Sequence, residues 1–137
     1  MPSRNRIFAS VLGVALLAAA AVAAFFADRA HERDDLYGRA TAMTGGDIGR
    51  GRAAFAHYGC GGCHALKGVS GASGLVGPPL DGVSARAIIG GRLENKPDNM
   101  MRWIRDPQGV SPGTAMPQLG VTPGDSRDIA AFLYTRT

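Results

Sequence analysis

The chain has 137 residues, of which 45% are hydrophobic and 19% charged, and its formal net charge is +4 at pH 7. This length leaves room for one small domain at most once a leader is set aside. After residue 27 there are 13 basic and 11 acidic residues, an excess too small to indicate a nucleic-acid interface. We therefore expect no nucleic-acid partner.

The first element in the chain is an uncharged run over residues 7–27, which follows two arginines. As a helix, its 21 residues would span roughly 31 Å, enough to cross a bilayer. Basic residues ahead of the run favour a cytoplasmic N-terminus and export of everything after it. The sequence thus predicts an N-terminal membrane anchor or uncleaved signal over 1–27, with 7–27 in the membrane. A signal peptide cleaved after Ala23 or Ala24 is the alternative.

Residues 28–46 mix both charges, end in a glycine pair and show no apolar periodicity. We expect a juxtamembrane linker with the dimensions of a coil, roughly 24 Å between its ends. The folded domain would then comprise residues 47–137.

Helices joined by glycine- and proline-rich loops are predicted within this domain, which makes the fold class all-α. The evidence is local: a capping residue or a proline precedes each apolar helical pattern. Long irregular stretches separate the helices, and only a large internal cofactor could help to order them. The predicted helices run from the N-cap Asp47 to about residue 58, from Pro97 to the break at Asp106 and Pro107, and from near Pro123 or Asp125 onward.

Both cysteines of the chain, Cys60 and Cys63, lie in one C-x-x-C-H motif that ends in His64. A redox dithiol would need a low-pKa thiolate at a helix start after a strand, and little strand pattern surrounds the motif. A zinc site needs four ligands, and this neighbourhood supplies three. Covalent haem attachment uses all three residues, because two thioethers hold the porphyrin while the adjacent imidazole ligates the iron. We predict one covalently attached haem c with His64 as a metal ligand.

The second axial ligand must come from the other two histidines or the five methionines. Met116 is the candidate, because it lies in the proline-bounded loop PGTAMP, 52 residues beyond His64, and a loop can lay a thioether against iron. Met100 and Met101 share a predicted helix, where core packing is the expected role. The predicted metal ligands are therefore His64 and Met116.

Taken together, these motifs resemble the class I cytochromes c over nearly all of 47–137. The resemblance rests on CGGCH, GPPLDGV and WIRDPQGVSPGTAMP, together with apolar and glycine positions in the first and last predicted helices. It is closest in character to the bacterial branch that serves respiratory oxidases, including cytochrome domains fused to oxidase subunit two. It implies the small class I cytochrome c fold, in which helices and loops wrap round one covalent haem. Here an N-terminal transmembrane helix in a bacterial inner membrane would leave the haem domain facing the periplasm.

The resemblance also implies further cofactor-binding residues. Pro78 would accept a hydrogen bond from the proximal histidine, and Leu80 would line the haem. Arg86 and Thr114 would bind the propionates, which need a partner in an apolar pocket. Trp103 stands where many relatives have a tyrosine near the methionine sulfur, and its indole can only donate a hydrogen bond.

Two further expectations concern the surface and the helix packing. Gly51, together with Ala130 or Ala131, would let the first and last helices of the domain cross closely, as the resemblance implies. The arginines of the predicted helices are expected to be solvated rather than to form a docking patch. They are Arg50, Arg52, Arg102 and Arg105.

Histidine and methionine ligation gives haem iron a positive potential, which suits a one-electron carrier. We therefore predict electron transfer in a respiratory chain, from a quinol:cytochrome c reductase to a terminal oxidase, with no enzymatic activity and no small-molecule substrate. One alternative is a structural or electron-relay haem subunit bound stably in a larger respiratory complex. A haem enzyme or gas sensor is the other.

Overall fold

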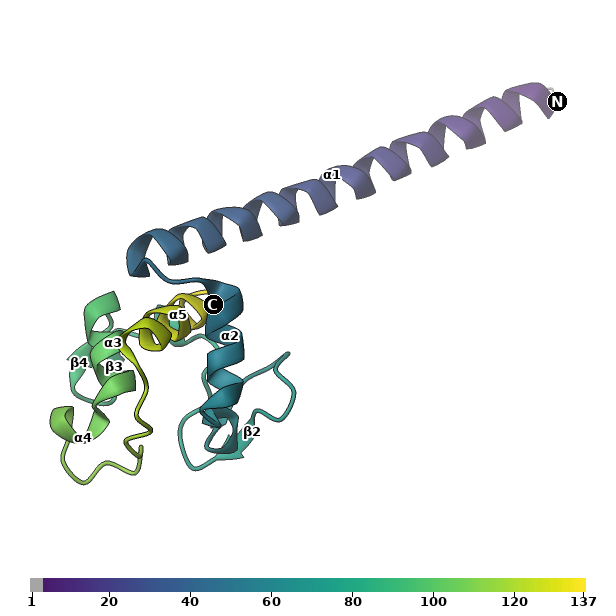
Figure 1. The fold of residues 1–137 in the computed structure, drawn as a ribbon. Coiled ribbons are helices and arrows are strands. Elements are labelled where there is room, and N and C mark those ends of the chain that lie inside the picture. The colour runs from purple at the N-terminus through teal and green to yellow at the C-terminus, as the bar shows by residue number, and fades with distance from the viewer. Residues whose placement is uncertain (1–3) are drawn as a thin grey trace. The chain divides into compact units, whose positions relative to one another are not determined.

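The computed structural model describes residues 4–137, in which helices predominate and the strands are only two or three residues long (Figure 1). This confirms the predicted fold class. Strand β1 pairs antiparallel with β2, and β3 with β4. The elements are α1 (Arg4–Thr44), α2 (Ile48–His57), η1 (Cys60–Gly62), β1 (His64–Ala65), β2 (Ser73–Leu75), η2 (Val83–Ala85), β3 (Ile88–Ile89), β4 (Leu93–Glu94), α3 (Pro97–Arg105), α4 (Pro107–Val110) and α5 (Pro123–Tyr134), where η denotes a 3-10 helix.

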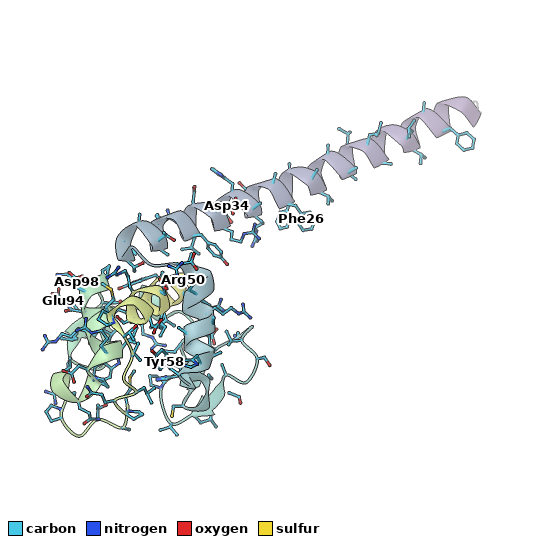
Figure 2. The ribbon with its side chains drawn as sticks, viewed as in Figure 1. Phe26, Asp34, Arg50, Tyr58, Glu94 and Asp98 are labelled. Carbon is cyan, nitrogen blue, oxygen red and sulfur yellow. The ribbon has the colours of Figure 1, made fainter. Side chains whose placement is uncertain are left out.

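Helix α1 belongs to two compact units, one ending at Leu36 and the other extending from Tyr37 to Thr137. From Phe8 onward α1 is long and apolar enough to cross a membrane, with a mean hydropathy of 2.4 in its apolar stretch. Phe26, labelled on this helix in Figure 2, is 65% exposed. Residues 1–3 of the predicted leader lie outside the described part of the chain.

The expectation of a coil over residues 28–46 is wrong, because α1 continues as a helix to Thr44. An exposed helix needs no apolar periodicity; helix-forming residues and pairs at i, i+4 spacing, such as His31 and Asp35, stabilise it instead. The glycine pair does mark the end of the helix. Gly45 has a φ of 68°, a left-handed conformation that glycine adopts readily after a C-cap.

The predicted starts of the three helices in the domain are confirmed. They are Asp47 before α2, Pro97 at the start of α3 and Pro123 at the start of α5. Asp106 ends α3 as predicted, but its carboxylate also accepts a hydrogen bond of 2.9 Å from the backbone N–H of Gly109. This cap starts the short helix α4, which the sequence analysis does not predict.

Helices α2 and α5 cross closely, as Figure 1 shows, and Gly51 is the residue that permits it. A Cβ built on Gly51 would lie 1.9 Å from the carbonyl oxygen of Asp128 and 3.0 Å from the nitrogen of Ile129. The role predicted for Gly51 is therefore confirmed. The atoms nearest to this Cβ belong to Asp128 and Ile129, and Ala130 and Ala131 on the same helix are fully buried.

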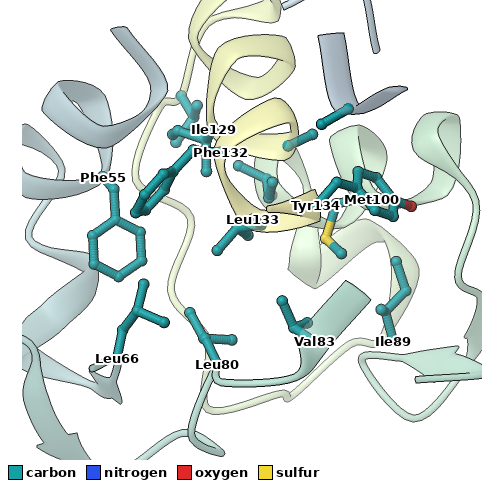
Figure 3. Close-up of a cluster of buried hydrophobic side chains, with 14 residues drawn as sticks. Phe55, Leu66, Leu80, Val83, Ile89, Met100, Ile129, Phe132, Leu133 and Tyr134 are labelled. Carbon is teal, nitrogen blue, oxygen red and sulfur yellow. The ribbon is translucent and has the colours of Figure 1, made fainter. Parts of the chain in front are cut away.

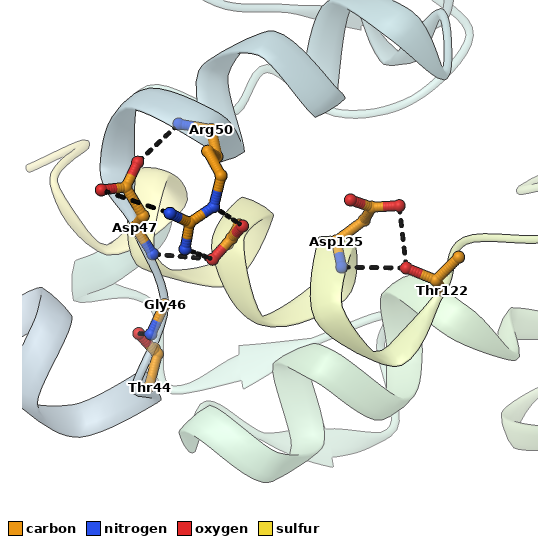
Figure 4. Close-up of polar contacts among 7 residues, drawn as sticks. Thr44, Gly46, Asp47, Arg50, Thr122 and Asp125 are labelled. Carbon is orange, nitrogen blue, oxygen red and sulfur yellow. Dashed lines mark hydrogen bonds and ion pairs between the residues drawn. The ribbon is translucent and has the colours of Figure 1, made fainter.

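The carboxylate of Asp128 also fastens the start of α2 to α5. Figure 4 shows Asp47 and Arg50, its two partners on the α2 side. The carboxylate accepts a hydrogen bond of 2.7 Å from the backbone N–H of Asp47 and another of 2.7 Å from Nε of Arg50. The bond from Arg50 is the main reason why the pKa of Asp128 is lowered. Arg50 is thus exposed but not a free solvated cation, and Arg52 likewise donates to the carbonyl of Gly68 at 2.7 Å.

The core lies where α2, α3 and α5 meet the segment between residues 66 and 89 (Figure 3). The rings of Phe55 and Phe132 pack edge to face with their centroids 5.8 Å apart. Met100 is 2% exposed and belongs to this cluster, as predicted for a methionine on the apolar face of a helix. The aliphatic side chains around them include Leu66, Leu80, Val83, Ile89, Ile104, Ile129 and Leu133.

Candidate functional site

One cavity of about 520 Å³ adjoins this core, and most of the side chains that line it are apolar. Its walls come from the end of α2, from η1, from the segment between residues 76 and 91, from α3, from the loop after α4 and from α5. The fold therefore brings every predicted site residue to one place. The predicted residues that line the cavity are Cys60, Cys63, His64, Pro78, Leu80, Arg86, Trp103, Thr114 and Met116.

The two cysteines lie on and directly after η1, which follows a tight turn at Gly59. Gly59 has a φ of 69°, so the chain can reverse there between α2 and η1. Both thiols are half-buried, and burial raises the pKa of the Cys60 thiol. An attacking redox cysteine needs a lowered pKa, so the environment of Cys60 argues against dithiol chemistry.

The imidazole of His64 is fixed by a carbonyl oxygen. Nδ1 of His64 lies 2.8 Å from the carbonyl oxygen of Pro78. Because a carbonyl can only accept, Nδ1 carries the proton of the neutral ring, and Nε2 carries the lone pair that a metal requires. The neighbouring Gly77 was not predicted, yet a Cβ on it would lie 2.3 Å from Cε1 of His64. Glycine before the two prolines is thus needed for the main chain to lie against the ring.

Two thioethers reach the cavity. Among the described methionines, Met100 and Met116 line it, and Met43 and Met101 do not. Met100 is held in the core on α3, whereas Met116 is half-buried in the loop after α4. Of these two methionines, only Met116 therefore has a main chain that lies outside a helix.

Arg86 and Thr114, predicted to bind propionates, are both tied to neighbouring main chain. A terminal nitrogen of the Arg86 guanidinium donates to the carbonyl oxygen of Pro79 and, at 3.4 Å, to that of Asp81. The hydroxyl oxygen of Thr114 accepts a bond of 3.4 Å from the backbone N–H of Met116. Arg86 thus brings a positive charge to a largely apolar wall, where a carboxylate would need one.

Asn95 is a residue that the sequence analysis missed. Its Nδ2 donates to the carbonyl oxygens of Val83, at 2.9 Å, and Arg86, at 2.8 Å, while its Oδ1 accepts from the hydroxyl of Tyr134 at 2.9 Å. Burial raises the pKa of Tyr134 to about 12, so this hydroxyl remains a donor. Asn95 therefore fastens the segment that carries Arg86 to α5. Nothing in the local sequence signals this, because its partners lie far apart in the chain.

Trp103 packs against main chain on one side of the cavity. A Cβ on Gly90, which has a φ of 56°, would lie 2.6 Å from Cε3 of the indole. Within the described chain the indole N–H donates to no acceptor. Trp103 is thus held by packing and not by a hydrogen bond of its indole.

A helical domain whose apolar cavity is lined by a C-x-x-C-H motif, an oriented histidine and a loop methionine is the domain of a c-type haem protein. The Cytochrome c family matches residues 48–137, and the chain belongs to this family. Cytochrome c oxidase subunit 2 of Alkalihalophilus pseudofirmus is 41% identical over 68 residues, which cover 50% of this chain and 19% of that protein. The chain thus spans about a fifth of the length of that relative. No solved structure matches it.

Membership of this family supplies the cofactor and the general function. The C-x-x-C-H motif that ends at His64 is the attachment site of one covalent haem c, as predicted. The cavity fits this group, because Cys60, Cys63 and His64 line it together with walls that are mostly apolar. The chain is therefore an electron-transfer protein.

Proposed function

We propose that this chain is a membrane-tethered one-electron carrier of a respiratory chain, with His64 and Met116 as the two axial ligands of its haem. The observation that carries the proposal is that one largely apolar cavity gathers Cys60, Cys63, His64 and Met116. The bound haem would supply an iron that changes its charge by one electron. The protein would hold that iron six-coordinate and away from water, so that no substrate reaches it.

The residues around the cavity support a carrier of positive potential. The carbonyl of Pro78 orients His64 and strengthens it as a donor. A thioether such as Met116 stabilises ferrous iron relative to a second nitrogen ligand. Apolar walls add to this effect, because they disfavour the higher charge of the oxidised state.

The proposed location rests on α1, and the proposed redox partners rest on the relative that matches by sequence. We propose that α1 crosses the inner membrane of a bacterium and leaves the haem domain in the periplasm, because basic residues precede its apolar stretch. The relative that matches by sequence is named as an oxidase subunit. By analogy, the electron acceptor of this chain would be a terminal oxidase, and the donor a quinol-oxidising complex.

A stably bound haem subunit is a second candidate, and the helical state of residues 28–44 favours it. A coil would let the domain swing between partners, whereas a helix of this length is a semi-rigid spacer of about 26 Å. Affinity purification of the full chain from membranes in mild detergent separates the two candidates. A bound subunit retains its complex in stoichiometric amount, and a mobile carrier is recovered alone.

The ligand assignment is tested with Met116→Ala and Met100→Ala in the full-length, haem-loaded protein. Met116→Ala should abolish the weak far-red absorption band from sulfur to ferric iron, lower the reduction potential and let carbon monoxide bind the reduced form. Met100→Ala should keep the band and lower the free energy of unfolding by roughly 2–5 kcal/mol, because it empties a buried site. Loss of the band in Met100→Ala alone would contradict the assignment.

A further inference from the structure

The side chain of Gln108, on α4, is wholly committed to the loop that carries Met116. Its Nε2 donates to the carbonyl oxygen of Thr114 at 2.8 Å and to that of Met116 at 2.9 Å. Its Oε1 accepts a bond of 3.1 Å from the backbone N–H of Gly113. A carboxamide has two N–H donors, so both are used, and all three bonds reach main chain within four consecutive residues.

The position of Gln108 is fixed by contacts that do not involve this loop. The carboxylate of Asp106 caps α4 through the backbone N–H of Gly109, and the same residue ends α3. The side chain of Pro107, directly before Gln108, is among the most deeply buried in the molecule. The position of Gln108 is therefore set by α3 and the core.

The loop around Met116 has few other polar restraints. The backbone N–H of Met116 reaches only the hydroxyl of Thr114, over a long 3.4 Å. In the described structure, no main-chain group between residues 117 and 121 forms a hydrogen bond, and most of that stretch is exposed. Gln108 therefore supplies the main polar restraint on the main chain of Met116.

We propose that Gln108 is the positioning residue that keeps Met116 on the haem iron, and so controls how often the sixth coordination position opens. This inference rests on the proposed assignment of Met116 as a ligand. Release of the thioether requires the loop to move away from the cavity, and three hydrogen bonds to a fixed side chain oppose that movement. Their loss should speed release by roughly 10- to 100-fold, given the modest net contribution of each bond.

The test measures how fast the thioether leaves the metal in the full-length, ferric, haem-loaded protein. Imidazole is the probe, since its binding rate at saturating concentration equals the rate at which the internal ligand leaves. Gln108→Leu removes all three bonds at similar volume. Gln108→Glu keeps the shape and the acceptor but turns a carboxylate toward two carbonyl oxygens, so it serves if the leucine variant does not fold. Gln118→Leu is the matched control, because Gln118 is exposed and makes no hydrogen bond within the described chain.

We expect both Gln108 variants to bind imidazole roughly 10- to 100-fold faster than the wild type, with a weaker far-red sulfur band and a lower reduction potential. Gln118→Leu should match the wild type. A Gln108 variant with a lower urea midpoint but a wild-type imidazole rate and potential would show a merely structural role and overturn the inference. If Met116→Ala itself retains the sulfur band, the ligand assignment fails and the inference with it. If Met116→Ala loses the band while both Gln108 variants bind imidazole at the wild-type rate, only the inference about Gln108 fails.

Discussion

Replacing Gly51 with alanine tests whether the close crossing of α2 and α5 holds the haem domain together. The added Cβ would lie 1.9 Å from the carbonyl oxygen and 2.4 Å from the carbonyl carbon of Asp128. Both atoms belong to the main chain of another helix, so no change of side-chain rotamer relieves the contact. To reach an ordinary separation of 3.4 Å, the helices must part locally by about 1.5 Å.

The expected loss in free energy of unfolding follows from the contacts that this displacement disturbs. Overpacking costs roughly 1–3 kcal/mol and occasionally more, and a contact between two backbones lies at or just above the upper end, at about 3–4 kcal/mol. The same shift strains the bonds from Asp128 to Asp47 and Arg50 and the contact between Phe55 and Phe132. Alanine regains up to about 1 kcal/mol through its higher helix propensity. We expect a net loss of about 2–3 kcal/mol, equivalent to a fall of roughly 10–20 °C in the melting temperature of a domain of this size.

The assay is urea unfolding of the haem-loaded protein, followed by circular dichroism. Gly49→Ala is the control on the same helix, because its Cβ would meet only the side chain of Asp47, at 3.3 Å. That variant should stay within about 1 kcal/mol of the wild type. An unfolding midpoint of Gly51→Ala equal to or above that of the wild type would refute the reasoning, since the helices could then separate without loss.

Three further predictions concern the ligand, the ion pair and the membrane. Gly77→Ala should displace the ring of His64, because the added Cβ would lie 2.3 Å from Cε1 of that ring. We expect an altered Soret spectrum and a changed reduction potential, and an unchanged spectrum would contradict this. Asp128→Asn should destabilise the domain at pH 7 but narrow its difference from the wild type below about pH 4. The reason is that a carboxylate with a lowered pKa stabilises the fold above its ordinary pKa and loses this effect as the pH falls through the lowered value. Urea midpoints between pH 3 and 7 measure it, and parallel curves would contradict it. The full chain should sediment with membranes through residues 7–27 and resist extraction by alkaline carbonate, whereas release by carbonate would show that these residues do not anchor it.

The sequence by itself determined the features that depend on neighbouring residues. The starts of the helices at Asp47, Pro97 and Pro123 are local, because a cap or a proline acts on the turn that contains it. The C-x-x-C-H motif is local as well, since its two cysteines and its histidine lie within five consecutive positions. Two local features were missed: the short helix α4, and the helical state of residues 28–44, where a coil was expected. The second arose because a missing apolar face says nothing about a helix that stays exposed.

Only the tertiary structure decided which distant groups meet. It showed that Met116 and Met100, but neither Met43 nor Met101, reach the cavity that the cysteines line. It identified Asp128 as the residue on α5 that faces Gly51, a pairing that depends on the crossing angle of two helices far apart in the chain. Even the contacts of Gln108, only five to eight residues away, require a loop that folds back on a fixed helix. Local sequence patterns do not encode such pairings. The pairings depend on how the whole chain buries its shared core and on how closely one main chain packs against another.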